Sequence, residues 1–155
     1  MTPGDWEQVR TIYLEGVHEG NSTFETEAPS WEAWDEAHHK SPRLVMRVGD
    51  HVLGWAALSP VSKRRVYSGV AEVSVYVTGS ARGKGIGRAL LDALIDKSEE
   101  SGIWTLQASI FPKNVASIEL HLQCGFREVG RRESIAMLKG VWRDTILFER
   151  RSKRI

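Results

Sequence analysis

The sequence predicts a mixed α/β (α+β) fold with helices packed on a twisted sheet, and three observations support it. Apolar residues recur at helical spacing near the start of the chain and again after residue 86. Short apolar runs of strand length lie between and beyond these stretches, bounded by Gly, Pro, Asn and Asp. The 155 residues suit one domain with one core, so we expect a single domain over residues 1–155.

The expected helices and strands follow the order α-α-β-β-β-α-β-α-β-β. They cover residues 5–17, 31–40, 44–48, 52–58, 70–77, 86–101, 104–111, 114–124, 126–134 and 143–150. Val9, Ile12 and Val17 fall at helical spacing in the first helix, and Ser30 can cap the second. Gly49-Asp50 predicts a tight turn that joins the first two strands into a hairpin.

The third strand, residues 70–77, shows a regular alternation of apolar and polar side chains. Because successive side chains of a strand point to opposite faces, this pattern separates two sets of residues. One face holds Val73, Val75 and Val77, and the other holds Glu72, Ser74 and Tyr76.

The elements that follow are bounded by stop signals. Gly102 and Gly125 are expected to end two helices, and Pro112 to end the strand between them. Arg88 and Asp92 lie one helical turn apart and can pair. The apolar stripe of the longer helix is expected to consist of Ala89, Leu90, Ala93 and Leu94.

Composition argues against several classes of partner. The 21 basic and 20 acidic residues give a formal net charge of +1, so the overall charge does not favour nucleic acid. The basic residues Arg150, Arg151, Lys153 and Arg154 are expected to form a solvated chain end. No stretch approaches the ~20 apolar residues that span a bilayer, and the N-terminus lacks a signal-peptide pattern. With Cys124 as the only cysteine, we expect a cytoplasmic protein with no nucleic-acid or membrane partner.

A glycine-rich loop lies between the third strand and the helix that starts near residue 86. Glycines let the backbone approach a ligand, and a helix N-terminus offers unpaired N–H groups and partial positive charge. These features indicate a cradle for a pyrophosphate, and a loop whose glycines only turn the chain is the alternative. The spacing is not that of a P-loop, because Gly85 follows Lys84, nor that of a Rossmann motif, because the third glycine comes one residue early.

The loop has the spacing Arg-x-x-Gly-x-Gly, with Arg82, Gly85 and Gly87, which resembles the acetyl-CoA loop of the GNAT superfamily of N-acetyltransferases. The segment from Asn114 to Phe126 resembles the second cofactor segment of that superfamily. Four further stretches are similar to the phosphinothricin and methionine sulfoximine acetyltransferase branch: 22–27, 67–77, 120–121 and 139–144. The resemblance implies a GNAT-type mixed, largely antiparallel twisted sheet flanked by helices, acetyl-CoA as cosubstrate, and no metal.

Members of that branch usually start with a short strand before the first helix, whereas this chain begins at the loop that leads into the helix. Two alternatives are open: either the start is misassigned or the first edge strand of the sheet is missing. An uncovered sheet edge would lower stability or favour association. The resemblance itself implies a homodimer.

The resemblance also implies roles for individual residues, since acetyl transfer needs a proton acceptor, a polarised carbonyl and a proton for the thiolate. Glu72 matches the general base of the family, with a solvent-facing strand glutamate as the alternative. His121 stands where many GNAT enzymes carry a tyrosine that protonates the thiolate, with a structural histidine as the alternative. The cofactor-binding residues are expected to be Val75, Tyr76 and Val77 through their backbone, then Arg82, Gly83, Lys84, Gly85, Ile86, Gly87 and Arg88 at the cradle, and Asn114 and Ser117. For Asn114 a helix N-cap is the alternative.

A small amino acid analogue is the expected acceptor. Arg64 and Tyr67 match the part of the phosphinothricin enzymes that contacts substrate, and a guanidinium can hold a carboxylate or phosphinate by two parallel bonds. A solvated basic loop is the alternative for Arg64. Phe24 and Glu25 are expected to line the same pocket. Two other functions remain open: acetylation of a protein N-terminus, lysine or polyamine, and acetyl-CoA sensing without catalysis.

Overall fold

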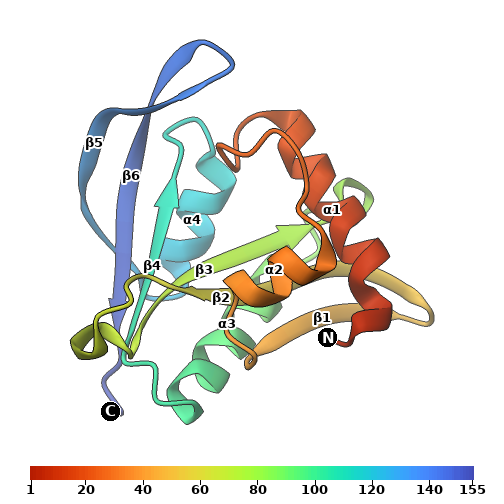
Figure 1. Ribbon diagram of the computed structural model, residues 1–155, viewed down its shortest axis with the longest axis horizontal. Helices are drawn as coiled ribbons and strands as arrows, with labels where there is room; N and C mark the ends of the chain where they lie inside the picture. Colours follow the sequence, from red (N-terminus) through yellow and green to blue (C-terminus); the bar gives the residue numbers. More distant parts are fainter.

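The computed structural model describes residues 1–155, with four α-helices and six strands in the predicted order (Figure 1). They are α1 Trp6–Glu19, α2 Trp31–Ala37, β1 Arg43–Val48, β2 His51–Pro60, β3 Val70–Val77, α3 Ile86–Glu100, β4 Thr105–Ile110, α4 Val115–Gln123, β5 Arg127–Leu138 and β6 Val141–Arg151. The Ser30 hydroxyl caps α2 as predicted, accepting from the Ala33 N–H at 3.2 Å. No helix combines the length and the apolar composition needed to cross a bilayer.

A single six-stranded sheet has the order β1-β2-β3-β4-β6-β5. Every neighbouring pair is antiparallel except β3 and β4, which are parallel. This arrangement is the mixed, largely antiparallel sheet that the sequence predicts. β1 is one edge strand and β5 the other, with no strand outside β1.

The two parallel strands stay paired over only three residues each, Val70–Glu72 with Thr105–Gln107. Beyond this point β3 and β4 spread apart, as Figure 1 shows. The facing edges of Val73–Val77 and Ala108–Ile110 therefore have no strand partner. Backbone N–H and C=O groups on such edges remain available to a ligand.

Helices cover both faces of the sheet. α1 and α2 pack on one face through a cluster that includes Ile12, Trp34 and Trp55. α3 packs on the other face, in the larger of the two clusters. The register of the sheet places Glu72, Ser74 and Tyr76 on the α1–α2 side and Val73 in the α3 cluster, as the alternation predicts.

The predicted apolar stripe of α3 is half wrong. Leu90 and Leu94 are buried, but Ala89 and Ala93 are exposed, and Leu91 and Ile95 are buried in their place. Two adjacent stripes of this helix both satisfy a helical period. The buried one removes more apolar area from water, because Leu and Ile present more surface than Ala.

Three of the tail residues also contact the domain, which the prediction of a solvated chain end did not include, although Arg151 and Arg154 remain exposed. Arg150 and Arg154 pair with the two oxygens of Glu99 at 3.0 and 2.9 Å. Arg151 donates to the Trp104 carbonyl, and only Lys153 keeps the predicted exposed state without a partner. The Glu99 side chain is 3% exposed, so a buried carboxylate at the end of α3 holds the chain terminus.

Candidate active site

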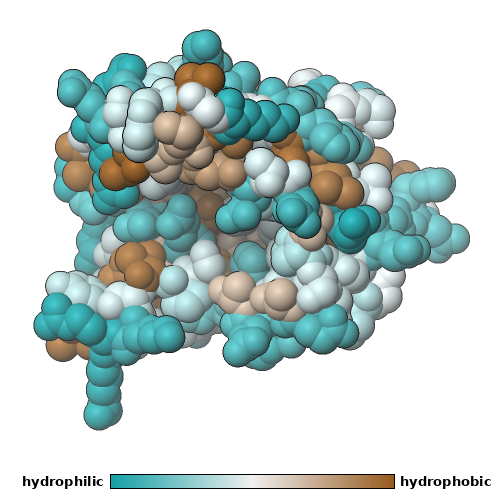
Figure 2. Space-filling model, turned by 45° about the horizontal axis from the view of Figure 1, so that its top comes forward, coloured by the Kyte–Doolittle hydropathy of each residue, from teal (hydrophilic) through white to brown (hydrophobic).

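A cleft of about 1120 Å³ opens where β3 and β4 diverge. Its walls are α1, α2 and the segment between them, the strands β3 and β4, the glycine-rich loop, the first turn of α3, and α4. Figure 2 shows a hollow on this side of the molecule, with apolar residues inside it and on its rim. Sites for one small molecule usually measure ~300–1,000 Å³, so this cleft lies slightly above the upper end of that range.

The glycine-rich loop forms one end of the cleft. Gly83 and Gly85 have φ angles of 75° and 79°, a backbone conformation that favours glycine. Gly85 directly precedes α3, and no side chain caps the N-terminus of that helix. A methyl group added at either glycine would meet nothing within 4 Å, so the space in front of the loop is open. This geometry suits a diphosphate.

Two carboxylates of α1 hold the loop in place. Glu15 accepts hydrogen bonds from the Thr78 hydroxyl and the Gly79 N–H, both at 2.8 Å. Glu19 pairs with Arg82 at 2.7 Å. Of the residues expected at the cradle, Arg82, Gly83, Gly85, Ile86, Gly87 and Arg88 line the cleft, and Lys84 does not. Arg88 pairs with Asp92 at 3.0 Å, as predicted.

Glu72 lies on the cleft wall, at the last position where β3 pairs with β4. Gln107, its partner on β4, donates from Nε2 to Glu72 Oε2 at 3.4 Å. Val75, Tyr76 and Val77 follow along the same wall, on the part of β3 that β4 has left. A carboxylate that can accept a proton and free backbone groups that can bind an anion therefore lie on one short stretch of strand.

His121 lies on α4, lines the cleft and is 4% exposed. Its Nδ1 is 2.7 Å from the Ser117 carbonyl, which can only accept, so Nδ1 carries the proton and Nε2 the lone pair. Burial lowers the pKa of His121, which keeps the ring neutral at pH 7. The buried Nε2 has no partner. It is a hydrogen-bond acceptor next to the cleft.

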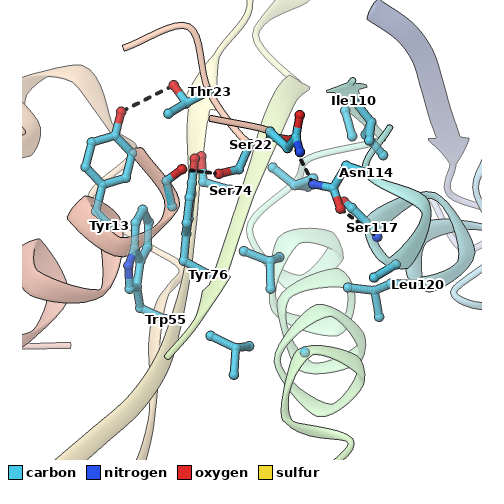
Figure 3. A pocket seen from close by; sticks show the side chains of 18 of the residues that line it. Tyr13, Ser22, Thr23, Trp55, Ser74, Tyr76, Ile110, Asn114, Ser117 and Leu120 are labelled. Atoms are coloured by element: carbon cyan, nitrogen blue, oxygen red, sulfur yellow. Dashed lines mark hydrogen bonds between the residues drawn. The ribbon is translucent and has the colours of Figure 1, made fainter. Parts of the chain in front are cut away.

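Asn114 acts as the N-cap of α4, which was one of its two predicted roles. Its Oδ1 accepts from the Ser117 N–H at 3.2 Å, and its Nδ2 donates to the Asn21 carbonyl at 3.1 Å. Figure 3 shows Asn114, Ser117 and Leu120 on one side of the cleft and Tyr13, Trp55 and Tyr76 on the other. Asn114 thus connects the start of α4 to the segment between α1 and α2.

Aromatic rings and carboxylates dominate the other half of the cleft. Phe24 packs edge-on against Phe111, with ring centroids 4.8 Å apart. Trp55 stacks on Tyr76 at 5.0 Å, and burial raises the pKa of Tyr76, so its phenol stays protonated. Glu25 also lines this half. The arginines that line the cleft, Arg82 and Arg88, both lie at the glycine-rich loop.

Arg64 and Tyr67 do not line the cleft. They lie on the exposed loop that leads from β2 into β3, where the Arg64 guanidinium sits 5.3 Å from the centroid of the Tyr67 ring. Tyr67 is 45% exposed. The structure therefore brings Phe24, Glu25 and Glu72 together and leaves Arg64 and Tyr67 outside.

Several cleft residues were not identified from the sequence. Trp34 and His38 line the aromatic half of the cleft from α2, and the His38 ring stacks on Trp34 at 4.0 Å. Gln107 and Glu15 reach the site through contacts between residues far apart in the sequence. For Gln107 a signal existed, because alternation along β4 puts it on a different face from Leu106 and Ala108, which are buried in the core.

Comparisons with known proteins agree with this geometry. A model of the acetyltransferase (GNAT) family matches residues 6–126. The phosphinothricin N-acetyltransferase of Alcaligenes faecalis is 32% identical, over 94% of this chain and 77% of that protein. The L-methionine sulfoximine/L-methionine sulfone acetyltransferase of Pseudomonas paraeruginosa is 32% identical, over 91% of this chain and 86% of that protein.

Solved structures give the same result. A ribosomal-protein-alanine N-acetyltransferase from Brucella melitensis superposes with a TM-score of 0.91 at 30% identity, covering 98% of this chain and 97% of that one. A phosphinothricin acetyltransferase from Sinorhizobium meliloti, in complex with acetyl-CoA, gives a TM-score of 0.87 at 29% identity, covering 97% of this chain and 85% of that one.

Proposed function

The chain belongs to the acetyltransferase (GNAT) family, and from that premise we propose that it transfers the acetyl group of acetyl-CoA to the α-amine of a small amino acid analogue. The observation that carries the proposal is the cleft at the divergence of β3 and β4. A carboxylate, an uncapped helix N-terminus and an aromatic-lined half-site open into this one space. Relatives named for phosphinothricin and for methionine sulfoximine or sulfone support the acceptor class.

Acetyl-CoA would occupy the end of the cleft at the glycine-rich loop. The open space at Gly83 and Gly85 fits a diphosphate on the N-terminus of α3. Arg82 and Arg88 line this end of the cleft, each paired with a carboxylate, Glu19 and Asp92 respectively. Asn114 and Ser117 would face the pantetheine arm from α4. The absence of a side-chain cap on α3 supports this assignment, because its first N–H groups are left for a ligand.

Glu72 would act as the general base. An alkylammonium ion is not a nucleophile, so the carboxylate takes one proton from the acceptor before the nitrogen attacks the thioester carbon. A C–N bond forms and the C–S bond then breaks. Those backbone N–H groups of Val75 to Val77 that point to the unpaired edge of β3 would stabilise the oxyanion between these steps.

His121 would handle the proton that the leaving thiolate needs. In the resting enzyme its Nε2 carries a lone pair, because Nδ1–H is donated to the Ser117 carbonyl. The ring must therefore first take the second proton of the attacking nitrogen at Nε2 and then pass it to sulfur. This order keeps the charge balanced and uses the one unpartnered nitrogen of the ring.

Arg64 would hold the anionic or strongly polar end of the acceptor. Its guanidinium lies on the loop that enters β3, the strand that carries Glu72. A second acceptor class, a peptide or protein amine, is favoured by a different observation. No lysine or arginine lines the acceptor half, and such a site does not require a free carboxylate on its substrate.

We also propose that two chains form a homodimer through the β5–β6 hairpin. Met137 and Trp142 lie opposite each other on its strands and are 48% and 60% exposed. Ile135 and Val141 add further exposed apolar surface to the hairpin. Exposed apolar side chains gathered on one hairpin are typical of an interface between protein chains. Light scattering on the parent and on Trp142→Asp tests the dimer. The parent must have twice the monomer mass.

A thiol-release assay with acetyl-CoA tests the proposed activity. The panel should contain phosphinothricin, methionine sulfoximine, methionine sulfone, their amides, short peptides and a polyamine. Thiol release with a free amino acid analogue, well above the acceptor-free rate, is the expected result. Faster reaction with peptides would favour the second class. No release with any amine, while acetyl-CoA binds, would leave the sensor as the function.

A further inference from the structure

The segment between α1 and α2 walls the acceptor half of the cleft, although it has no helix or strand of its own. Asn21, Ser22, Thr23 and Phe24 all line the cleft. A segment that lacks the regular backbone hydrogen bonds of a helix or strand takes its position from contacts with other elements. The residues that hold it therefore decide where Phe24 lies.

Arg143 of β6 makes the contacts that fix the start of this segment. Its Nη1 donates to the Gly20 carbonyl at 3.1 Å, and its Nη2 donates to Asn21 Oδ1 at 2.9 Å. Gly20 ends α1 in the left-handed conformation, with φ of 76°. A helix C-terminus has unpaired carbonyls and partial negative charge, so a guanidinium there satisfies both.

The same guanidinium also contacts the aromatic wall. It lies 4.3 Å from the centroid of Phe111, and Phe111 in turn packs edge-on against Phe24. Arg143 itself does not line the cleft. A planar guanidinium can donate in its plane and stack on a ring with its face at the same time, which an ammonium cannot do.

Asn114 fastens the segment from the cofactor side. Its Nδ2 donates to the Asn21 carbonyl. Its Oδ1 caps α4 by accepting from the Ser117 N–H, and Figure 3 shows these two residues side by side. Asn21 is thus held by Arg143 through its side chain and by Asn114 through its backbone. The acceptor wall and the first turn of α4 are connected through one residue.

We propose that Arg143 is a positioning residue that fixes Gly20–Phe24 against the start of α4 and thereby sets the acceptor wall at Phe24. The inference rests on the proposed acetyltransferase function, because it assigns that wall to the acceptor. Loss of the guanidinium releases the segment, so acceptor affinity falls while the glycine-rich loop and Glu72 remain in place. Arg143 acts only through the residues that it holds.

The test compares Arg143→Leu, Arg143→Lys and the control Arg131→Leu. Arg131 lies on the neighbouring strand β5, pairs with Asp144 at 2.7 Å, and makes no contact with the segment. Arg143→Leu should raise the KM for the acceptor about 10-fold or more, as expected for two lost charge-assisted hydrogen bonds. The KM for acetyl-CoA should stay within about twofold of the parent value, which corresponds to a small change in binding free energy. The acceptor KM of Arg143→Lys should fall between those of the parent and Arg143→Leu, and the acceptor KM of Arg131→Leu should match that of the parent.

Hydrogen exchange at the backbone amides of residues 21–24 gives a readout that needs no catalysis. Arg143→Leu should speed exchange there, in the unliganded protein, while the amides of β3 and α3 remain protected. If the parent acetylates no amine, the proposed function fails, and the exchange experiment still decides whether Arg143 holds the segment. An unchanged acceptor KM with unchanged exchange would overturn the inference. Parallel losses in both KM values and in the melting temperature would also overturn it, because they would mean a general structural role.

Discussion

Glu72 and Gln107 face each other across the last rung of the parallel ladder between β3 and β4, joined by a hydrogen bond of 3.4 Å from Gln107 Nε2 to Glu72 Oε2. The same rung is where the sheet opens to form the cleft. The proposed base therefore lies at the closed end of the opening, on a paired and rigid position, while the backbone that would stabilise the oxyanion lies just beyond it.

The first prediction concerns Glu72→Gln. Gln keeps the shape of Glu72 but cannot take a proton at neutral pH, so kcat should fall by ~100- to 10,000-fold. The affinity for acetyl-CoA, measured by calorimetry, should remain near that of the parent, because Glu72 is not part of the glycine-rich loop that would hold the diphosphate. Glu100→Gln, at the exposed end of α3 and outside the cleft, serves as the control. Turnover within a few-fold of the parent would make Glu72 a structural residue.

The second prediction concerns Gly85→Val. Gly85 has φ of 79° at the start of α3, and a β-branched residue is strained there. Acetyl-CoA affinity should fall at least ~10-fold, because the cradle changes shape and its open space is filled. Gly102→Val is a matched control, since Gly102 has φ of 80° at the other end of the same helix. Both variants should lose stability, but Gly102→Val should bind acetyl-CoA as the parent does.

The third prediction uses Glu99, whose carboxylate lies buried at the end of α3. Burial alone would raise the pKa of Glu99, but the hydrogen bonds from Arg150 and Ser152 outweigh it and lower the pKa overall. A carboxyl group with a lowered folded-state pKa stabilises the fold above its unfolded value and loses that contribution as pH falls. Glu99→Gln should therefore cost about 3 kcal/mol at pH 7, and the difference from the parent should shrink as pH falls below about 4.5.

Urea unfolding at several pH values measures this effect, and Glu100→Gln is the control. Glu100 pairs with Lys97 at 2.9 Å on the surface, with its side chain 55% exposed. Such exposed pairs contribute ~0–1 kcal/mol. Equal stability changes for the two variants would show that the tail does not rely on Glu99.

The order of elements and the bounds of β3 could be predicted from the sequence, because both depend on local patterns. Alternation from Val70 to Val77 identifies one strand, and glycines mark several helix ends. The lengths of β5 and β6 were underestimated, because the sequence predicts strands at 126–134 and 143–150 whereas the hairpin extends over Arg127–Leu138 and Val141–Arg151. Its polar stretch around Ser134 contains a register shift, and this irregularity hides the alternation that continues to Leu138.

The same difference between local patterns and long-range contacts applies to the residues of the site. Glu72 and the glycine-rich loop could be predicted because they belong to one continuous stretch of sequence. That stretch runs from β3 through the loop into the first turn of α3. The contacts of Arg143 with Gly20 and of Glu15 with Thr78 could not, since they join residues separated by 123 and 63 positions. A single sequence carries no local pattern for such pairs, and the packing of the sheet alone brings them together.

The last prediction concerns the acceptor and Arg64. Arg64 lies on an exposed loop before β3 and outside the cleft, so its proposed role requires that a bound acceptor engage it. If it holds a carboxylate or phosphinate, Arg64→Ala should raise the KM for free amino acid analogues by about 10-fold or more, because a charge-assisted bidentate pair is lost. The amides of the same substrates lack that charge, so they should react slowly with the parent and lose little more in Arg64→Ala.

The comparison to make is kcat/KM for each acid and its amide in the parent, in Arg64→Ala and in the neighbouring control Arg65→Ala. Arg65 carries the same charge on the same loop, which separates a specific contact from general attraction of an anion. A protein acetyltransferase would show the opposite pattern. It would accept peptides and amides as well as free acids, and Arg64→Ala would change neither. That result would remove the small-acid acceptor while leaving the family assignment intact, since the cradle and Glu72 do not depend on Arg64.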